Sequence, residues 1–144
     1  MLIEQISVFI ENKKGRLAEI ADVLAENNID ISALSLADTD EYGVLRMIVC
    51  DPHKAKSVLS EHGVIGKVTK TLAVAIDDTP GGFSSALHTL TDRGIEIKYM
   101  YACVSHEVGK ALMVLSVDDP EAAEAIISET ACGNVDPKSI YRIK

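Results

Sequence analysis

One sequence pattern occurs twice in the chain, and this internal repeat is the feature that most constrains its fold. Gly15 and Gly81 are 66 residues apart. The same spacing relates apolar positions on both sides of these glycines: Val8 to Val74, Ile10 to Ile76, Leu24 to Leu90, Ile29 to Ile95 and Ile31 to Ile97. Further along, Asp51-Pro52 matches Asp119-Pro120 at a spacing of 68, so we expect two extra residues in the turn at 105–110. The sequence therefore predicts two copies of one folding unit, at residues 1–69 and 70–144.

Each copy shows the same series of hydrophobic periods, with alternation for strands and a 3.6-residue period for helices. The first copy predicts strands at 3–10, 29–37, 43–50 and 64–69, a helix at 14–28, a polar turn at 38–42, and a second helix that begins at Pro52, with Asp51 as its N-cap, and ends at Gly63. The second copy predicts strands at 71–76, 95–103, 110–117 and 139–143, a helix to residue 93 with Thr79 as N-cap and Pro80 as first residue, and a helix at 120–129. The order in each copy is β-α-β-β-α-β, an α+β unit.

The first helix of each copy carries one apolar stripe at positions i, i+3, i+4 and i+7, which predicts the side that packs on a core. The stripe residues are Leu17, Ile20, Ala21 and Leu24 in the first copy, and Phe83, Ala86, Leu87 and Leu90 in the second.

A glycine turn between the first strand and the first helix stands at the same place in both copies. Backbone N–H groups at a helix start lack partners within the helix and attract a carboxylate or phosphate. Glycine there lets a ligand approach closely, and two glycines in a first helical turn, as at Gly81-Gly82, are costly for the helix unless something compensates. The turn can equally be a plain connection, and Asn12 and Asp78 can either cap a helix, the commoner role, or accept a ligand ammonium group.

Composition excludes several classes of function. The net charge of −8 argues against nucleic-acid binding, and no apolar run approaches the length of a membrane span. The first residues lack the basic segment and apolar core of a secretory signal, and the three cysteines form no Cys-x-x-Cys motif. These features predict a cytoplasmic protein with reduced thiols.

No motif for catalysis or metal binding is present. The four histidines are scattered, no Gly-x-Ser-x-Gly occurs, and no cysteine has an obvious neighbouring base. Arg16 beside Gly15 is the single candidate for a phosphate-holding enzyme loop. We therefore expect a protein without catalytic activity, cofactor or metal.

The repeated unit resembles the ACT domain. Asp78-Thr79-Pro80-Gly81-Gly82-Phe83 is similar to the signature of that family, and Asn12-Lys13-Lys14-Gly15-Arg16-Leu17 is similar with Lys14 in place of the usual Pro. The resemblance covers the whole chain as a tandem pair. It implies ferredoxin-like units, each an antiparallel sheet with its helices on one face, paired side by side, and an amino acid or other small effector bound where the first loop of one unit meets its neighbour.

By position, the resemblance implies a ligand site in both loops. Its residues are Glu11, Asn12, Lys13, Lys14, Gly15, Arg16 and Leu17 in the first copy, and Asp77, Asp78, Thr79, Pro80, Gly81, Gly82 and Phe83 in the second. Residues around 32–36 and 98–102 would face these loops from the second strands. The first loop carries Lys13, Lys14 and Arg16 and the second lacks cations, so we expect different ligand preferences.

The sequence predicts a non-catalytic regulatory protein that binds a small effector, an amino acid first among the candidates. The alternative is a ligand-free interaction module, a detached regulatory subunit of a metabolic enzyme. We also expect a homodimer, because the outer strands of the sheet remain available for pairing.

Overall fold

The chain forms two compact units, each built from antiparallel strands and helices. The structure is a computed structural model and describes residues 1–38, 41–104 and 107–141. The N-terminal unit consists of Glu4–Thr69 with Tyr141, and the C-terminal unit of Met1–Ile3 with Lys70–Ile140. The α+β class and the ferredoxin-like organisation predicted from the sequence are confirmed. The division into domains 1–69 and 70–144 stays a prediction.

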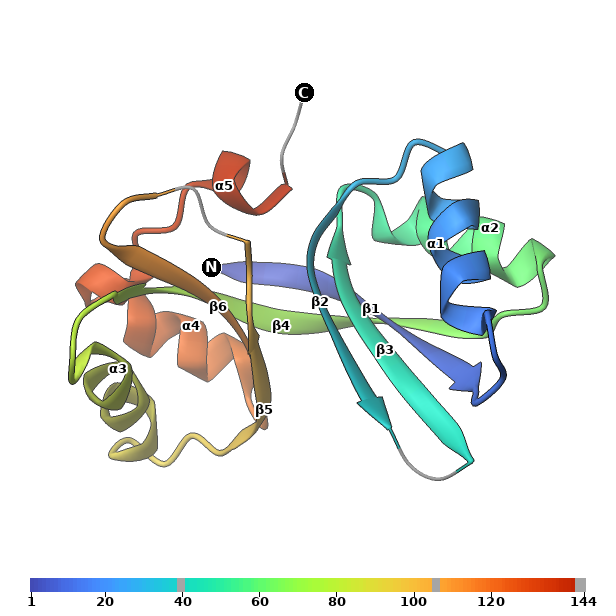
Figure 1. The fold of residues 1–144 in the computed structure, drawn as a ribbon. Coiled ribbons are helices and arrows are strands. Elements are labelled where there is room, and N and C mark those ends of the chain that lie inside the picture. The colour runs from blue at the N-terminus through green and yellow to red at the C-terminus, as the bar shows by residue number, and fades with distance from the viewer. Residues whose placement is uncertain (39–40, 105–106, 142–144) are drawn as a thin grey trace. The chain divides into compact units, whose positions relative to one another are not determined.

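The N-terminal unit places two helices on one face of an antiparallel sheet (Figure 1). Its elements are β1 (Leu2–Glu11), α1 (Arg16–Glu26), β2 (Ile31–Asp38), β3 (Tyr42–Val49), α2 (Pro52–Glu61) and the start of β4 (Gly66–Asp77). The order β2-β3-β1 continues to the start of β4, since the Phe9 N–H donates to the Ile65 carbonyl at 3.2 Å. Residues 39–40 of the predicted polar turn lie outside the described residues.

The core of this unit lies between the sheet and the two helices. Every second residue of β1 enters it, as the alternation predicted, with Ile6, Val8 and Ile10 each at most 5% exposed. Of the predicted stripe on α1, Ile20 and Leu24 are buried, but Leu17 is 42% exposed and Ala21 is also exposed. Val23 is buried in their place. The stripe is therefore rotated toward Val23, and Leu17 in the first turn remains outside the core.

The C-terminal unit repeats this arrangement with the rest of β4, α3 (Gly82–Thr91), β5 (Ile97–Ala102), β6 (Lys110–Val117) and α4 (Pro120–Ser128). The strand order is β4-β6-β5, and the core contains Leu72, Val74, Ile76, Leu90 and Ile127. In the stripe of α3, Ala86 and Leu90 are buried, Leu87 is half-buried and Phe83 is 46% exposed. Residues 105–106, where the insertion was expected, lie outside the described residues.

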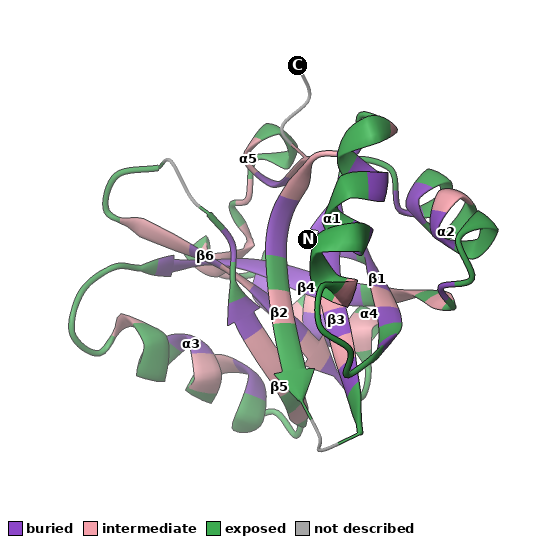
Figure 2. Cartoon of the chain, turned by 45° about the vertical axis from the view of Figure 1, so that its right-hand side comes forward, coloured by how far each residue is buried: buried purple, intermediate pink, exposed green. Residues whose placement is uncertain are grey.

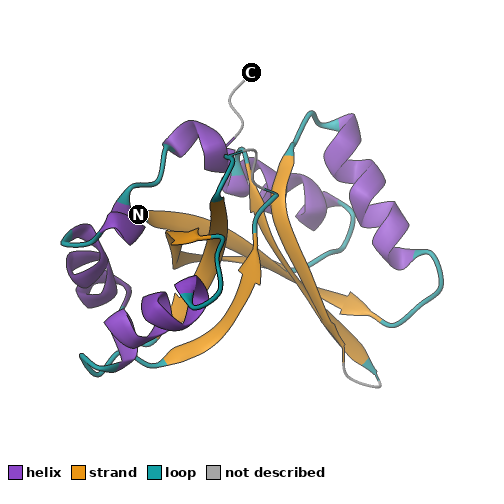
Figure 3. Cartoon of the chain, turned by 60° about the vertical axis from the view of Figure 1, so that its left-hand side comes forward, coloured by secondary structure: helices purple, strands orange, loops and turns teal. Residues whose placement is uncertain are grey.

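The strand predicted at 139–143 is wrong. A short 3-10 turn, η1 (Ala131–Gly133), is followed by a helix, α5 (Pro137–Tyr141), which Figure 3 shows nearest the C-terminus. Residues 142–143 of the predicted strand lie outside the described residues. The fourth-strand position of this unit is taken by Met1–Ile3, because the Ala73 N–H donates to the Met1 carbonyl at 2.8 Å. A segment distant in sequence thus pairs where the repeat predicted a local one.

The N-cap predicted at Asp51 is confirmed, and the second helix of the other copy is capped in the same way by Asp119. The Asp51 carboxylate accepts the Lys54 N–H at 2.9 Å, and the Asp119 carboxylate accepts the Ala122 N–H at 3.0 Å. A proline follows each aspartate as the first helical residue. Both helix starts therefore have their exposed N–H groups satisfied in the same way.

Replacing either cap should cost stability. We expect Asp51→Ala to lower the free energy of unfolding by about 1 kcal/mol, since an N–H at the helix start loses its acceptor. Asp51→Ser keeps a capping oxygen and should cost much less. Urea unfolding followed by circular dichroism measures both, and an equal loss in the two variants would contradict a capping role.

Candidate functional site

The two strand-to-helix turns have the same backbone geometry. Gly15 and Gly81 are the N-cap residues of α1 and α3, with left-handed φ angles of 83° and 87°. The Arg16 N–H donates to the Lys13 carbonyl at 3.2 Å, and the Gly82 N–H donates to the Thr79 carbonyl at 3.0 Å. A glycine adopts this conformation without steric cost. The repeat seen in the sequence is therefore a repeat of the turn itself.

The first-turn assignment predicted for α3 is wrong. Thr79 is not the N-cap of α3 and Pro80 is not its first residue, because the N-cap lies two residues later, at Gly81. The N-cap residues of both helices are glycines and give no side-chain hydrogen bond, so a capping role for Asn12 and Asp78 stays a prediction. With a glycine at each N-cap, the first N–H groups of α1 and α3 have no side-chain acceptor at that position.

A small pocket of about 90 Å³, open to solvent, lies beside the N-terminal turn. Its floor is a row across three strands, because Gly43 of β3 pairs with Ile10 of β1 on one side and Asp38 of β2 on the other. Leu36 of β2 adds to the floor. The start of α1 contributes Arg16 and Leu17, and the turn contributes Glu11, Asn12 and Lys13. Figure 2 shows the end of β2 exposed beside the start of α1.

Gly43 and Leu36 pack closely in this floor. A Cβ at Gly43 would lie 3.3 Å from Leu36 Cδ1, closer than ordinary van der Waals contact, and 3.5 Å from the Ala37 carbonyl oxygen. Leu36 and Leu17 are 49% and 42% exposed, although both point to the side of the sheet that the helices cover. The pocket therefore combines exposed apolar surface with charged side chains at its edge.

The charges at this pocket are partly paired. Lys13 Nζ lies 2.7 Å from the Glu11 carboxylate, and Arg16 Nη1 lies 3.0 Å from the Glu19 carboxylate. The hydrogen bond from Lys13, with its positive charge, lowers the pKa of Glu11 below the usual value of a glutamate. The side chain of Asp38 makes no hydrogen bond or ion pair with the residues that the structure describes. Its carboxylate faces the pocket without a counter-charge from that part of the chain.

The pKa of Glu11 should depend on Lys13 and not on Lys14. Because the carboxylate form is favoured, the pair stabilises the fold above the ordinary pKa of glutamate, and this contribution is lost as pH falls through the lowered pKa. We expect Lys13→Met to return the Glu11 pKa toward its ordinary value and Lys14→Met to leave it low. A carboxyl-carbon NMR titration measures this, and equal effects of the two variants would contradict the pairing.

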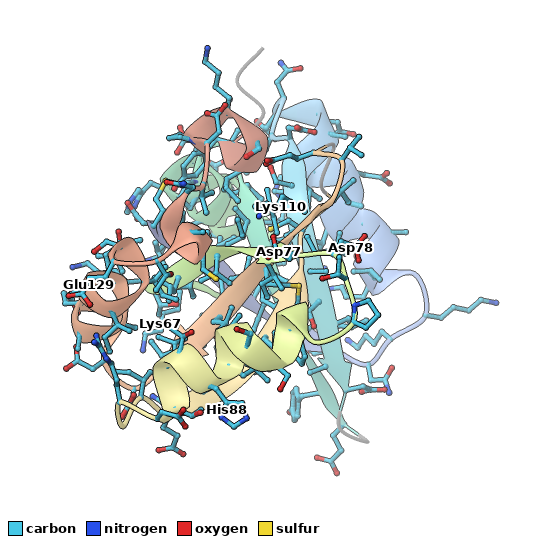
Figure 4. The ribbon with its side chains drawn as sticks, turned by 90° about the vertical axis from the view of Figure 1, so that its left-hand side faces the viewer. Lys67, Asp77, Asp78, His88, Lys110 and Glu129 are labelled. Atoms are coloured by element: carbon cyan, nitrogen blue, oxygen red, sulfur yellow. The ribbon has the colours of Figure 1, made fainter. Side chains whose placement is uncertain are left out.

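The C-terminal turn differs from the N-terminal turn in its ion pair and in its tighter packing. Asp77, at the end of β4, forms an ion pair with Lys110, the first residue of β6, and this hydrogen bond raises the pKa of Lys110 (Figure 4). Gly82 lies so close to the strand end that a Cβ there would be 2.1 Å from the Asp77 carbonyl oxygen. The close approach that the sequence suggested for a ligand is thus made by the chain itself.

This geometry predicts the effect of adding a methyl group at Gly82. We expect Gly82→Ala to lower the free energy of unfolding by about 2 kcal/mol, because the turn must shift to relieve the overlap. The matched control is Arg16→Ala, since the equivalent turn already accommodates a Cβ, and it should cost less than about 0.5 kcal/mol. Urea unfolding compares them, and equal costs would show that the two turns are equally tight.

The sequence-predicted site residues divide between the two turns. Five of the first loop line the N-terminal pocket: Glu11, Asn12, Lys13, Arg16 and Leu17. Lys14 and Gly15 do not line it. In the second loop, Asp77 and Gly82 line a smaller pocket with Ser85, Lys110 and Cys132, whereas Asp78, Thr79, Pro80, Gly81 and Phe83 do not.

Sequence reasoning missed three residues of the N-terminal pocket. Leu36 was within the segment expected to face the loop, but Ile10, Asp38 and Gly43 were not singled out as site residues. Asp38 and Gly43 sit at the two ends of the turn between β2 and β3. Only the strand register, which places Gly43 between Ile10 and Asp38, brings them to the site.

The described residues hold no group of histidine, cysteine, aspartate and glutamate side chains arranged to bind a metal ion. Among the helices in these residues, none is long and apolar enough to cross a membrane.

Comparison with known proteins identifies the repeat. A family model described as an ACT domain pair matches residues 1–143. Protein BT0572 from Bacteroides thetaiotaomicron has a crystal structure that is similar over 99% of this chain and 98% of its own, with 31% sequence identity and a TM-score of 0.90. No curated protein matches the chain.

More distant structures share the fold. The regulatory subunit of aspartate kinase from Thermus thermophilus, in its ligand-free form, aligns over 90% of this chain and 96% of its own, with 14% identity and a TM-score of 0.64. The corresponding subunit from Thermus flavus aligns over 90% and 94%, with 17% identity and a TM-score of 0.61.

Proposed function

The chain belongs to the family of ACT domain pairs, and we propose that it is a non-catalytic regulatory protein whose effector is an amino acid. The observation that carries this proposal is the pocket at the N-terminal turn, where exposed leucines adjoin charges of both signs. Pockets that bind small molecules combine apolar walls with a few polar groups that orient the ligand. Two proteins with similar folds are regulatory subunits of aspartate kinase, and this supports a regulatory role.

Regulation requires that the effector favours one state of the protein over another. A ligand shifts an equilibrium only by the difference in its affinity for the two states. We propose that an amino acid bound at the strand-to-helix turn changes how ACT units pack against a neighbour, and that a metabolic enzyme responds. The cytoplasmic location and the homodimer predicted from the sequence are part of this proposal.

A thermal-shift screen against the twenty amino acids tests the binding function. An effector present at a hundred times its dissociation constant adds about 2.7 kcal/mol to the free energy of unfolding. For a chain of this length, the melting temperature should rise by about 2–4 °C for each kcal/mol. Leu17→Arg should abolish the shift, because its side chain would enter the pocket from an exposed position.

The matched control is Ala18→Arg, which places the same charge on the next, exposed residue outside the pocket lining. Loss of the shift in both variants would contradict binding at this pocket. Substitution of Gly82 is unsuitable for this test, because the overlap with Asp77 would disturb the fold itself.

The alternative function is that of a ligand-free interaction module, a detached regulatory subunit. It is favoured by the surfaces left open at the edge strands, β2 and β5, each of which is paired on one side only in the strand order. If none of the twenty amino acids changes the melting temperature, this alternative replaces effector binding.

A further inference from the structure

We propose that the two ACT units have diverged, so that the N-terminal unit alone binds the effector and the effector is a zwitterionic amino acid with an aliphatic side chain. The ammonium group of the ligand would contact the Asp38 carboxylate, and the ligand carboxylate would lie beside the Arg16 guanidinium group. This inference rests on the proposed function, and it adds the number of sites, the chemical class of the ligand and two residues, Asp38 and Gly43, that orient and accommodate it.

Charges of opposite sign reach the N-terminal pocket from two different elements. Asp38 comes from the end of β2, and Arg16 from the first residue of α1, next to the N–H groups of a helix start. A free amino acid carries both an ammonium and a carboxylate group, so it complements this pair in one orientation. A neutral or singly charged ligand would leave one of the two charges without a partner.

The two charged groups are also free to respond to a ligand. The carboxylate of Asp38 has no ion pair or hydrogen bond to the described residues, whereas the carboxylate of Glu11 forms an ion pair with Lys13. Arg16 contacts Glu19 at 3.0 Å in a pair whose Glu19 side chain is 65% exposed, and such surface pairs contribute little to stability. Arg16 can therefore exchange Glu19 for a ligand carboxylate at small cost.

The space between these charges is apolar. Leu17 and Leu36 leave about half of their surface exposed, and Ile10 and Gly43 complete the floor. Burial of an aliphatic side chain against these leucines removes apolar surface from water, which favours binding. A Cβ at Gly43 would press on Leu36 Cδ1 at 3.3 Å, so a larger residue there would displace the Leu36 side chain from its place in the floor.

The C-terminal unit lacks each of these features. At the repeat spacing of 66, Val104 stands in place of Asp38, Ala102 in place of Leu36, and Gly82 in place of Arg16. Ala111 replaces Gly43, since it pairs with Ile76 as Gly43 pairs with Ile10. Lys110, a cation that lines the pocket at this end, is paired with Asp77. The same backbone turn therefore presents no matched pair of charges.

Isothermal titration calorimetry of the full chain with L-leucine, L-valine and L-methionine tests the proposal. We expect one site per chain for at least one of these probes, and binding at least tenfold weaker for L-glutamate and L-lysine. Two sites per chain would overturn the divergence of the units. Tighter binding of a charged amino acid would overturn the aliphatic class while leaving the proposed function intact.

Asp38→Asn tests the position of the ammonium group. We expect a loss of about tenfold or more in affinity for the best probe, because asparagine keeps an acceptor oxygen but loses the negative charge that faces the ammonium group. Against 4-methylpentanoate, the leucine analogue without an amino group, the variant and the original protein should bind equally weakly. Asp22→Asn removes the same charge from an exposed position on α1 and should bind the probe normally. Equal affinities in the two variants would overturn the role of Asp38.

Gly43→Ala tests the space for the side chain. The added methyl group should weaken binding of L-leucine more than binding of L-alanine. Gly66→Ala is a matched control, because its Cβ would also meet side-chain atoms at 3.3 Å, those of Ile6 and Val8, away from the pocket. A change of preference in the Gly66 variant, or none in the Gly43 variant, would overturn the assignment.

A control in the C-terminal unit distinguishes failure of this inference from failure of the proposed function. Asp77→Asn breaks the ion pair with Lys110 and should leave both affinity and stoichiometry unchanged. Loss of binding in this variant, with binding retained in Asp38→Asn, would place the site in the C-terminal unit and overturn the inference alone. No binding of any of the twenty amino acids to the original protein would overturn the proposed function with it.

Discussion

The left-handed glycine at each helix start is the constraint on which both candidate sites depend. Gly15 and Gly81 have φ angles near 85°, a conformation that costs other residues free energy. This angle lets a strand end and a helix begin within four residues, so the helix start lies directly over the end of the sheet. Because glycine offers no side chain to cap the helix, the first N–H group of each helix donates instead to a carbonyl of the turn, that of Lys13 or that of Thr79.

One backbone turn supports two different local chemistries because the side chains around it differ in size and charge. In the N-terminal unit, the side chain is missing from the floor at Gly43, and the cation Arg16 stands at the helix start. In the C-terminal unit, the floor carries Ala111, and the helix start carries Gly82, packed against the Asp77 carbonyl. A glycine thus stands in the floor of the N-terminal unit and at the helix start of the C-terminal unit, where it packs against the strand end.

Most of the fold could be predicted because its signals are local and occur twice. Alternation identified β1, a nearly unbroken apolar run identified β3, and Asp51 caps the helix that it was expected to cap. The failures come from places where local signals do not decide. Ile140 suits a strand or a helix equally well, and only the distant segment Met1–Ile3 determines that the strand position is already occupied. Thr79-Pro80 matches a cap and first helical residue, but the left-handed Gly81 starts the helix later.

The site was less predictable than the fold because it depends on strand register. The turn residues could be found from the motif, yet Asp38 and Gly43 reach the pocket only through pairing between β1, β2 and β3. Register places Gly43 of the floor near the start of α1, where Leu17 is 42% exposed. A ligand bound beside Leu17 and Leu36 would bury apolar surface that folding leaves in water, while Arg16 needs only to release an exposed partner. Its binding energy would then be available to favour one state of the protein over another, and this is the condition for regulation.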